Sequence, residues 1–386
     1  VPPLCRGACR GVPALKPALS AIRTEMQQRL PASGQTMYIG AFRLRRGRRG
    51  ACGRTNNGID GRLDAPEGGR APLLGHCRRC RSSAAGTRML SLLRAWRERG
   101  WSEIDAAAYA QAWQGFGGSV ATHPLIVERL AALARIPVRY LGWFAGGELL
   151  AAIPCWGNHL ALAKEVLKKR RQRGAFDLGN AEVILPIAEN ARVPVRQVMR
   201  YVSEVNAGQI AGLKPQPEGL ALARAPEEYS TKFRYNQRRE LRLLAEAGGS
   251  LRPMLDYSPV QQALMYADLF QRRWGFAPRG KAHLGEVFGL LREFITGSVL
   301  LHDERPIAIQ ILYRVEAPKW VSLEFINGGV DPATRDFSPG SVLSFVNTQA
   351  AWAEARALGK PLRYSFGRAD RGYKDRWCHR VPVYRI

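Results

Sequence analysis

The stretch that decides the fold is residues 320–377, WVSLEFINGGVDPATRDFSPGSVLSFVNTQAAWAEARALGKPLRYSFGRADRGYKDRW. Its first residues, 320–326, alternate apolar and polar side chains, a pattern that is typical of a half-buried strand. Asn327-Gly328-Gly329 follows directly, and these glycines predict that the strand breaks there in a bulge or a turn. Asp331-Pro332 and Ser338-Pro339-Gly340 then mark a polar loop.

A helix is expected after this loop, over residues 341–357. Leu358-Gly359-Lys360-Pro361 ends it with a glycine and then a proline, and residues 362–366 form a second short strand. This order suits an anion site, because the first N–H groups of a helix are unpaired and lie at the positive end of its dipole. The alternative is a crossover helix that packs on a sheet and binds nothing.

Positive charge is the main feature of the composition. The 386 residues include 58 Lys+Arg and 32 Asp+Glu, which gives a net charge of +26. Such an excess favours an anionic partner: nucleic acid, a membrane surface or an acidic ligand. The sequence contains no run of eighteen apolar residues, so no transmembrane helix is expected.

Residues 1–88 differ from the rest of the chain. They hold 17 of the basic residues, four acidic residues and five of the seven cysteines, with no sustained apolar periodicity. We expect a disordered or spurious extension, either translated upstream sequence of a GC-rich genome or a disordered basic tail. A metal-binding arm is the third alternative. Cys77-Arg-Arg-Cys80 supplies only one ligand pair where a zinc site needs four ligands, so no metal cofactor is expected.

Two domains are predicted beyond this extension, over residues 89–217 and 218–386. In the first domain, residues 138–156 predict a β-hairpin that turns at Gly146-Gly147. Residues 193–205 predict a helix, and Lys214-Pro-Gln-Pro217 is typical of a linker.

The second domain opens with a basic helix, residues 226–249. When the helix is projected at 100° per residue, its apolar residues fall on one side and its basic residues sweep the other. The basic face is a candidate surface for RNA, lipid or a phosphorylated cofactor; the alternative is a face that is only solvated. Its residues are Lys232, Arg234, Arg238, Arg239 and Arg242.

The order of elements predicts the fold class. Residues 218–386 predict three helices, an antiparallel meander of three strands, a loop, a helix and a strand. We therefore expect an α/β (α+β) fold, in which helices flank a mixed, mostly antiparallel sheet.

This order resembles the Gcn-five-related N-acetyltransferases, and most closely the branch of FemAB-like peptidyltransferases and of acyltransferases near cellulose synthesis genes. That branch carries a basic helix S-x-K-x-R-x-N-x-R-R, here residues 230–239, and a terminal Tyr-Lys-x-x-Trp, here residues 373–377. With the His123-Pro124 start and the Ser338-Pro339-Gly340-Ser341 loop, the chain more specifically resembles the Mig-fourteen (macrophage-inducible) antimicrobial-peptide-resistance family. The resemblance covers roughly residues 95–386 and implies tandem acyltransferase-like domains, the first of them degenerate.

The resemblance also implies where a donor binds. The pyrophosphate loop of the acyltransferases reads Arg/Gln-x-x-Gly-x-Gly/Ala; here Arg335 opens it, Ser338 replaces the first glycine, Gly340 fits the second and Ser341 follows. Acyl-CoA is the implied cofactor, and an aminoacyl-tRNA is the alternative donor. Lys374 is a candidate ligand for a phosphate or carboxylate.

Acyl transfer to an amine requires a base for the ammonium group and an acid for the leaving group. Glu324, on the strand before the loop, is the candidate base, and Tyr373 is the candidate acid. The alternative for Glu324 is a carboxylate on the solvent side of its strand.

The family resemblance implies a bacterial protein, cytoplasmic and peripheral on the inner face of the cytoplasmic membrane, that supports resistance to cationic antimicrobial peptides. Its expected partners are the anionic membrane surface and a tRNA or acyl-CoA donor. A non-catalytic membrane-associated binding protein is the main alternative. A DNA-binding regulator is the third alternative, but DNA is not an expected partner, because residues 193–213 are the only segment to consider as a helix-turn-helix.

Overall fold

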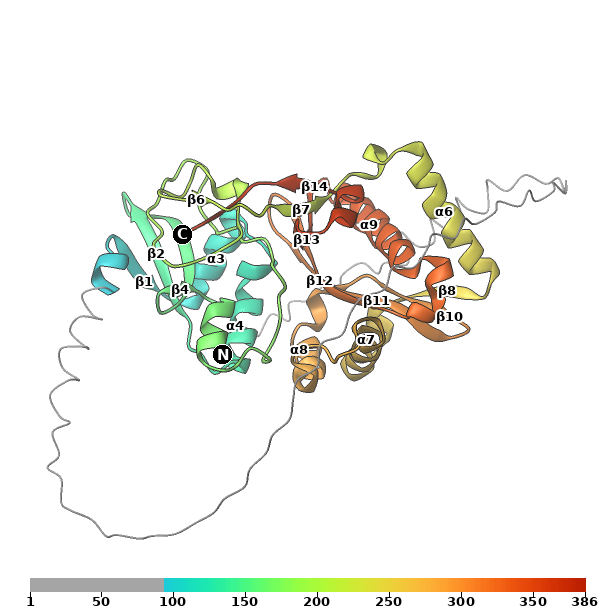
Figure 1. The fold of residues 1–386 in the computed structure, drawn as a ribbon. Coiled ribbons are helices and arrows are strands. Elements are labelled where there is room, and N and C mark those ends of the chain that lie inside the picture. The colour runs from blue at the N-terminus through green and yellow to red at the C-terminus, as the bar shows by residue number, and fades with distance from the viewer. Residues whose placement is uncertain (1–93) are drawn as a thin grey trace, which may run out of the picture.

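The computed structural model describes residues 94–386 (Figure 1). The extension expected over residues 1–88, with its cysteine pair, lies outside the described residues. Within the described chain, none of the helices combines the length and the apolar character that crossing a bilayer requires.

The first half of the described chain is built on a four-stranded antiparallel sheet in the order β1-β2-β3-β4. Gly146 and Gly147 take φ values of 60° and 85° between β2 and β3, so the predicted hairpin is confirmed. Helices α3 and α4 pack beside this sheet, and a short helix, α5, follows. The bounds are β1 Trp101–Ile104, α3 Ala106–Phe116, α4 Pro124–Leu133, β2 Arg139–Ala145, β3 Glu148–Trp156, β4 His159–Leu160 and α5 Lys164–Lys169.

The second half forms a larger sheet in the order β14-β7-β13-β12-β11-β10-β8, with β9 paired to β11. Only β12 and β13 pair in parallel, so the predicted mixed α/β fold with a mostly antiparallel sheet is confirmed. The strands are β7 Leu220–Ala223, β8 Gly249–Pro253, β9 Ile295–Thr296, β10 Ser298–His302, β11 Arg305–Glu316, β12 Val321–Val330, β13 Leu362–Arg368 and β14 Cys378–Val381.

Helices cover both faces of this sheet (Figure 1). Helices α6 and α9 lie on one face, and α7 and α8 lie on the other. Their bounds are α6 Thr231–Glu246, α7 Pro259–Trp274, α8 Leu284–Leu290 and α9 Pro339–Ala357. The largest hydrophobic cluster joins α4 of the first half to α7 and α8 of the second, so the two halves share one core.

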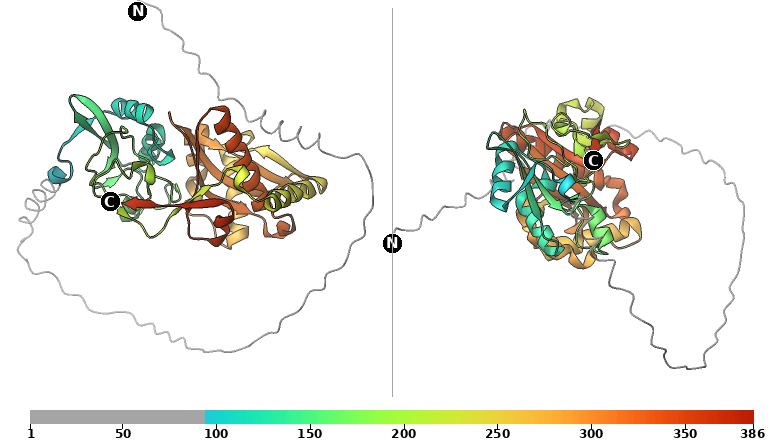
Figure 2. Two further views of the ribbon diagram at one scale, coloured as in Figure 1. Left: turned by 90° about the horizontal axis from the view of Figure 1, so that it is seen from above. Right: turned by 90° about the vertical axis from the view of Figure 1, so that its left-hand side faces the viewer.

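The end of the chain returns to the first half. Strand β15, Val383–Arg385, pairs with β5, Val202–Ser203, and with β6, Lys214–Pro215 (Figure 2). The boundary predicted at residues 217/218 falls between β6 and β7, which belong to different sheets. The domain division itself stays a prediction.

Strand β12 does not break at Asn327-Gly328-Gly329, as the sequence predicts, but runs on to Val330. The register slips by one residue opposite Ile311 and Leu312, which places the bulge at Ile326. Gly329 meets helix α7 so closely that a Cβ there would lie 2.6 Å from the Leu269 Cβ. The glycine therefore permits close packing and makes no turn.

The helix predicted over residues 193–205 is absent from the structure. This segment instead makes isolated bridges, in which Val193 pairs with Ile210 and Val198 with His159, before it enters β5. Pro194 and the β-branched residues of the segment disfavour a helix. The candidate helix-turn-helix segment, residues 193–213, therefore contains no α-helix.

Strands β12 and β13 diverge along their length. Their parallel pairing ends at Glu324 opposite Ser365, although β12 continues to Val330 and β13 to Arg368. A segment of the first half, residues 177–182, runs into this opening. A Cβ on Gly179 would lie 3.4 Å from the Ile326 carbonyl oxygen, and a Cβ on Gly367 would lie 3.9 Å from Asn180.

A buried ion pair fixes this segment to the sheet. Glu182 is fully buried, and its carboxylate accepts hydrogen bonds from the Arg363 guanidinium, with Nε to Oε2 at 3.0 Å, and from Ser203 Oγ at 2.7 Å. The Glu182 N–H donates to Glu324 Oε1 over 2.8 Å. The pair joins residues 181 positions apart in sequence.

We expect Glu182→Gln to lower the free energy of unfolding by about 3 kcal/mol, because it removes the buried counter-ion of Arg363 and leaves only the more exposed Glu204, at 3.3 Å. Urea denaturation measures the change. Glu189→Gln, which removes a solvent-exposed partner of Lys319, serves as the control and should change stability little. Equal effects of the two substitutions would contradict a special role for the buried pair.

Candidate donor-binding site

A cavity of about 470 Å³ lies on the α9 face of the large sheet, where the loop after β12 meets the start of α9. We call it the arginine cavity, because three guanidinium groups line it. They come from the end of α7, the loop and the turn before β14. The residues that line it are Arg273, Ala308, Ile309, Gln310, Phe325, Gly328, Val330, Pro332, Arg335, Ser338, Pro339, Gly340, Ser341, Leu343, Ser344, Tyr373, Arg376 and Trp377.

Five of the residues predicted from the sequence meet in this cavity: Arg335, Ser338, Gly340, Ser341 and Tyr373. Three of them adjoin the N-terminus of α9, and Tyr373 comes from a 3-10 turn, Gly372–Arg376, that follows β13. The loop and the Tyr-Lys-x-x-Trp ending are thus brought together.

Local geometry at the start of α9 follows from the loop sequence. Asp331 begins a 3-10 turn, Pro332–Phe337, in which its Oδ1 accepts the Ala333 N–H over 2.9 Å. Ser338 then takes the left-handed conformation, with φ 48° and ψ 45°, and Pro339 is the first residue of α9. Ser338 therefore holds a conformation that glycine adopts more readily.

Two amide groups at the start of α9 are bonded within the chain and are not available to a ligand. The N–H groups of Ser341 and Val342 both donate to the Ser338 carbonyl oxygen, at 2.9 Å and 3.1 Å. Pro339 has no N–H to offer. The helix N-terminus thus presents fewer free amides to a ligand than a glycine loop would.

The electrostatic character of the arginine cavity is strongly positive. Arg273, Arg335 and Arg376 line it, and none of its lining residues is acidic. The Arg273 guanidinium also lies 4.8 Å from the centre of the Trp274 ring. Arginine presents a planar fork of donors that matches phosphate and carboxylate oxygens, so the cavity suits an anionic group.

A buried chain of side-chain amides supports the cavity floor. Gln310 Nε2 donates to Ser344 Oγ over 2.7 Å, and Asn347 Nδ2 donates to Gln310 Oε1 over 2.8 Å. The Ser298 N–H completes the chain by donating to Asn347 Oδ1 at 3.1 Å. These bonds lock β10, β11 and α9 together and fix the Gln310 side chain at the floor of the cavity.

Sequence reasoning missed Arg273, Arg376, Gln310 and Ser344. The signal for Ser344 was present: together with Asn347 it forms a polar pair one turn apart on the buried face of a helix. Arg376 is one of the unspecified positions in Tyr-Lys-x-x-Trp. Nothing in the sequence distinguishes Arg273 from other basic residues in the last turn of a helix.

Glu324 does not line the arginine cavity. It is fully buried, and burial together with the charge of Glu182 raises its pKa well above its usual range. Its Oε1 accepts the Glu182 N–H over 2.8 Å. The role of Glu324 as a base stays a prediction, and these contacts favour a positioning role.

Lys374 also lies outside the lining of the cavity. Its ammonium group donates to the carbonyl oxygens of Phe366 at 2.8 Å and Arg368 at 2.7 Å. These bonds join the turn before β14 to the end of β13. The contacts account for two of its three donors and place Tyr373, the preceding residue, at the cavity.

The basic helix α6 lies beside the arginine cavity. Ser230 caps it by accepting the Phe233 N–H at 3.2 Å, and Phe233 packs against the Trp377 ring with centroids 4.9 Å apart. Trp377 in turn lines the cavity. The predicted basic face, from Lys232 to Arg242, is therefore anchored next to the loop, with most of its side chains exposed.

The left-handed conformation of Ser338 leads to a testable contrast. Ser338→Gly removes about 1–2 kcal/mol of backbone strain and offsets the extra freedom of glycine in the unfolded chain, so we expect no loss of stability. Ser341→Gly, three residues on and inside α9, should cost about 0.5–1 kcal/mol. Thermal unfolding of both variants checks this order, and the reverse order would contradict it.

The pH dependence of stability should reveal the buried Glu324 carboxyl. Its pKa is higher in the folded than in the unfolded chain, so the stability it contributes is present below the unfolded pKa and is lost as the pH rises towards the folded pKa. Glu324→Gln keeps the oxygen that accepts the Glu182 N–H but does not titrate. From pH 5 to pH 8 we expect this variant to gain stability relative to the unmodified protein in urea titrations. A difference that does not change with pH would show that Glu324 is ionised.

Comparisons with known proteins complete this description. Among solved structures the chain is similar to FemX, with 10% identity, 74% of this chain and 95% of that chain covered, and a TM-score of 0.45. It is also similar to the C-terminal domain of a putative lysylphosphatidylglycerol synthetase from Agrobacterium fabrum, with 14% identity, 72% and 91% covered, and a TM-score of 0.39. A third similar structure is a tandem GNAT protein from the clavulanic acid biosynthesis pathway, with 10% identity, 74% and 97% covered, and a TM-score of 0.36.

The search of curated proteins finds no match to this sequence. The model of the Mig-14 family, by contrast, matches residues 123–386. That span begins at the His123-Pro124 pair and takes in α6, the loop before α9 and the Tyr-Lys-x-x-Trp ending. The chain therefore belongs to the Mig-14 family.

Proposed function

We propose that this protein transfers an acyl or aminoacyl group from an anionic donor to an amine, at the inner face of the bacterial cytoplasmic membrane, and so supports resistance to cationic antimicrobial peptides. The arginine cavity carries the proposal. It combines three guanidinium groups, no acidic lining residue and a helix N-terminus beside the point where the parallel strands β12 and β13 diverge.

The donor binds through its phosphates in this proposal. Arg335, Arg273 and Arg376 provide forked donors for phosphate oxygens, and Ser341 contributes a hydroxyl near the start of α9. Acyl-CoA and aminoacyl-tRNA are both phosphorylated donors. The basic face of α6 extends the positive surface beyond the cavity, which favours the longer polyanion.

The reaction itself needs few groups from the protein. The amine nitrogen, after losing its ammonium proton to water, forms a bond to the acyl carbon, while the bond from that carbon to the donor sulfur or oxygen breaks. Tyr373 gives its phenolic proton to the leaving atom and recovers one from the nitrogen, which sheds its extra proton as the amide forms. Glu324 acts as a positioning residue, because its contact with Glu182 holds residues 177–182 in the opening beside the cavity.

Membrane association in this proposal is electrostatic. Lys232, Arg238, Arg239 and Arg242 are exposed on α6 and face outward from the sheet. Each basic residue near an anionic bilayer contributes about 1 kcal/mol of attraction. Flotation with vesicles that contain anionic lipid, compared with neutral vesicles at the same salt concentration, tests this part of the proposal.

A non-catalytic binding protein is the second candidate function. The observation that favours it is the start of α9, where Pro339 lacks an N–H and the Ser341 and Val342 amides bond to the Ser338 carbonyl oxygen. A site of this kind could hold an anion through its arginines without activating a bound carbonyl. Donor binding without transfer would support this second candidate.

Donor binding is the direct test. We expect acetyl-CoA or an aminoacyl-tRNA to raise the unfolding temperature of the full chain, and Arg335→Ala with Arg376→Ala to abolish that rise because the phosphates lose their main ligands. Arg385→Ala, on β15 and remote from the arginine cavity, is the control for charge. If neither donor stabilises the unmodified protein, the assignment of the arginine cavity as a donor site is wrong.

Transfer is then measured with a donor that binds. Tyr373→Phe should keep donor binding and lower the rate of amide formation by about 10²–10⁴-fold. An unchanged rate removes Tyr373 from the mechanism. Binding of a donor with no detectable transfer by the unmodified protein would overturn the enzyme assignment and leave the binding function.

A further inference from the structure

An exposed apolar stripe runs along helix α7, on the side of the large sheet away from α6 (Figure 1). Val260, Leu264 and Trp274 lie within an arc of about 80° when the helix is projected at 100° per residue. These residues are 61%, 63% and 47% exposed, and Phe276, just beyond the helix, is 60% exposed. Single exposed apolar residues are common, but four large ones along one face of one helix mark an interaction surface.

The two aromatic residues of the stripe flank a well-defined turn. Gly275 ends α7 in the left-handed conformation, with φ 77°, and its N–H donates to the Gln271 carbonyl oxygen over 2.8 Å. The Phe276 ring packs edge-on against Phe270, with centroids 5.5 Å apart. The backbone therefore holds Trp274 and Phe276 at the surface on either side of the turn, with much of each side chain exposed.

Basic residues surround these rings. Residues 269–285 contain three arginines, one lysine and no acidic residue. Arg272 is paired with two aspartates, at 2.9 Å and 3.1 Å, whereas Arg279 and Lys281 are exposed. The loop that carries the aromatic residues is therefore positively charged.

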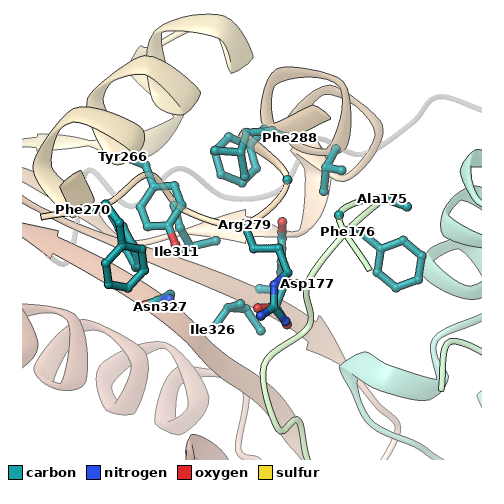
Figure 3. A pocket seen from close by; sticks show the side chains of 16 residues that line it. Ala175, Phe176, Asp177, Tyr266, Phe270, Arg279, Phe288, Ile311, Ile326 and Asn327 are labelled. Carbon is teal, nitrogen blue, oxygen red and sulfur yellow. The ribbon is translucent and has the colours of Figure 1, made fainter. Parts of the chain in front are cut away.

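A second basic segment, residues 168–173, adjoins this loop. It reads KKRRQR, and its Lys and Arg residues are exposed. The chain then reaches residues 174–177, which line one cavity together with Arg279 (Figure 3). A Cβ on Gly174 would lie 3.4 Å from the Gly280 Cα, so the two segments are in contact although they lie about a hundred positions apart in sequence.

Asp177 lies at the junction of the two basic segments and lines the same cavity as Arg279. Its Oδ1 accepts the Gly179 N–H over 2.8 Å and lies 3.3 Å from Lys164 Nζ. The carboxylate is therefore matched by a lysine that belongs to neither basic segment. The surface keeps its positive charge.

We infer that the stripe on α7, the loop that follows it and residues 168–173 form one surface that binds an anionic lipid bilayer, with Trp274 and Phe276 inserted among the headgroups, an inference that rests on the membrane location in the proposed function. We call it the α7 surface. Its basic residues attract the anionic headgroups, and the exposed rings leave water as the contact forms. Trp suits this depth because its ring is apolar and its N–H is polar.

The α7 surface differs in kind from the basic face of α6. The α6 face offers charge, and attraction between exposed charges weakens as salt rises. The α7 surface adds apolar side chains, whose removal from water does not depend on charge. Binding through the α7 surface therefore persists at salt concentrations that abolish binding through α6.

The aliphatic residues of the stripe favour lipid over nucleic acid. Bases stack on aromatic rings and phosphates pair with Lys and Arg, so Trp274, Phe276 and the basic residues would also suit a single-stranded RNA. Val260 and Leu264 can neither stack on a base nor pair with a phosphate. They add apolar area that a bilayer buries.

Flotation of the full chain with vesicles of phosphatidylcholine and phosphatidylglycerol tests the inference, at low salt and at about 0.5 M sodium chloride, where exposed charges are screened. We expect Trp274→Ser with Phe276→Ser to lower the bound-to-free ratio about tenfold at both salt concentrations, because the buried apolar area is lost. Tyr235→Ser, which removes a similarly exposed ring from α6, is the matched control and should change the ratio little.

A brominated lipid reports insertion directly, because bromine on the acyl chain quenches the fluorescence of a tryptophan that reaches it. The chain has nine tryptophans, so the unmodified protein is compared with Trp274→Phe, which keeps an apolar ring. We expect the quenched part of the emission to disappear in this variant. Equal quenching in the two proteins overturns the insertion of Trp274.

The possible results separate the α7 surface from the rest of the proposed function. Flotation that disappears at about 0.5 M salt, and that the double variant leaves unchanged at low salt, overturns the α7 surface and leaves the electrostatic contact of α6 standing. Salt-resistant flotation that the double variant loses supports the α7 surface even where no donor binds or reacts.

Two further results overturn the inference. If the unmodified protein does not float with anionic vesicles at all, both membrane contacts are wrong and the donor site stands. If the double variant floats normally but no longer shifts a single-stranded RNA in a gel, the surface binds RNA instead of lipid.

Discussion

The ion pair between Glu182 and Arg363 is the constraint on which the junction of the two halves depends. A buried carboxylate is tolerated only where a counter-charge and further hydrogen bonds replace its water, and here Arg363 and Ser203 do so. The same residue offers its N–H to Glu324. One buried residue of the first half thus contacts β12 at Glu324, where its pairing with β13 ends, and β13 at Arg363, two residues before that end.

The divergence of β12 and β13 follows from that arrangement. Beyond Glu324 and Ser365 the two strands no longer pair, and residues 177–182 lie in the opening, where Gly179 approaches Ile326 and Asn180 approaches Gly367. On the far side β12 keeps its bonds to β11 but accommodates one extra residue, Ile326. Because of the bulge, the adjacent residues Ile326 and Asn327 both face α7 and α8, whereas Phe325 and Gly328 line the arginine cavity.

The sequence predicted what depends on local signals. Glycine and proline residues at its ends predicted the helix α9, and Gly146-Gly147 predicted the hairpin. These predictions succeed because turn and cap residues act over only a few positions. Local signals failed where distant packing decides. The sequence predicts a turn at Gly329, but the glycine lies in a strand and allows α7 to pack closely against it. The sequence also predicts a helix over residues 193–205, but this segment forms bridges to distant segments instead. Arg363 and Glu182, far apart in sequence, could not be paired without the fold.

At the proposed donor site, Ser338 stands where the acyltransferase loop has a glycine, and this affects how the loop would meet an anion. The backbone still takes the left-handed conformation that glycine would take, so the path of the chain into α9 is kept. A ligand reaches fewer backbone amides than at a glycine loop. A serine side chain stands at the loop, Pro339 has no N–H, and the Ser341 and Val342 amides bond to the Ser338 carbonyl oxygen. Three arginines from three separate segments supply the donors in their place. Because guanidinium groups on flexible stems tolerate more ligand shapes than fixed amides do, this cavity suits a bulky phosphorylated donor better than the closely gripped pyrophosphate of a glycine loop.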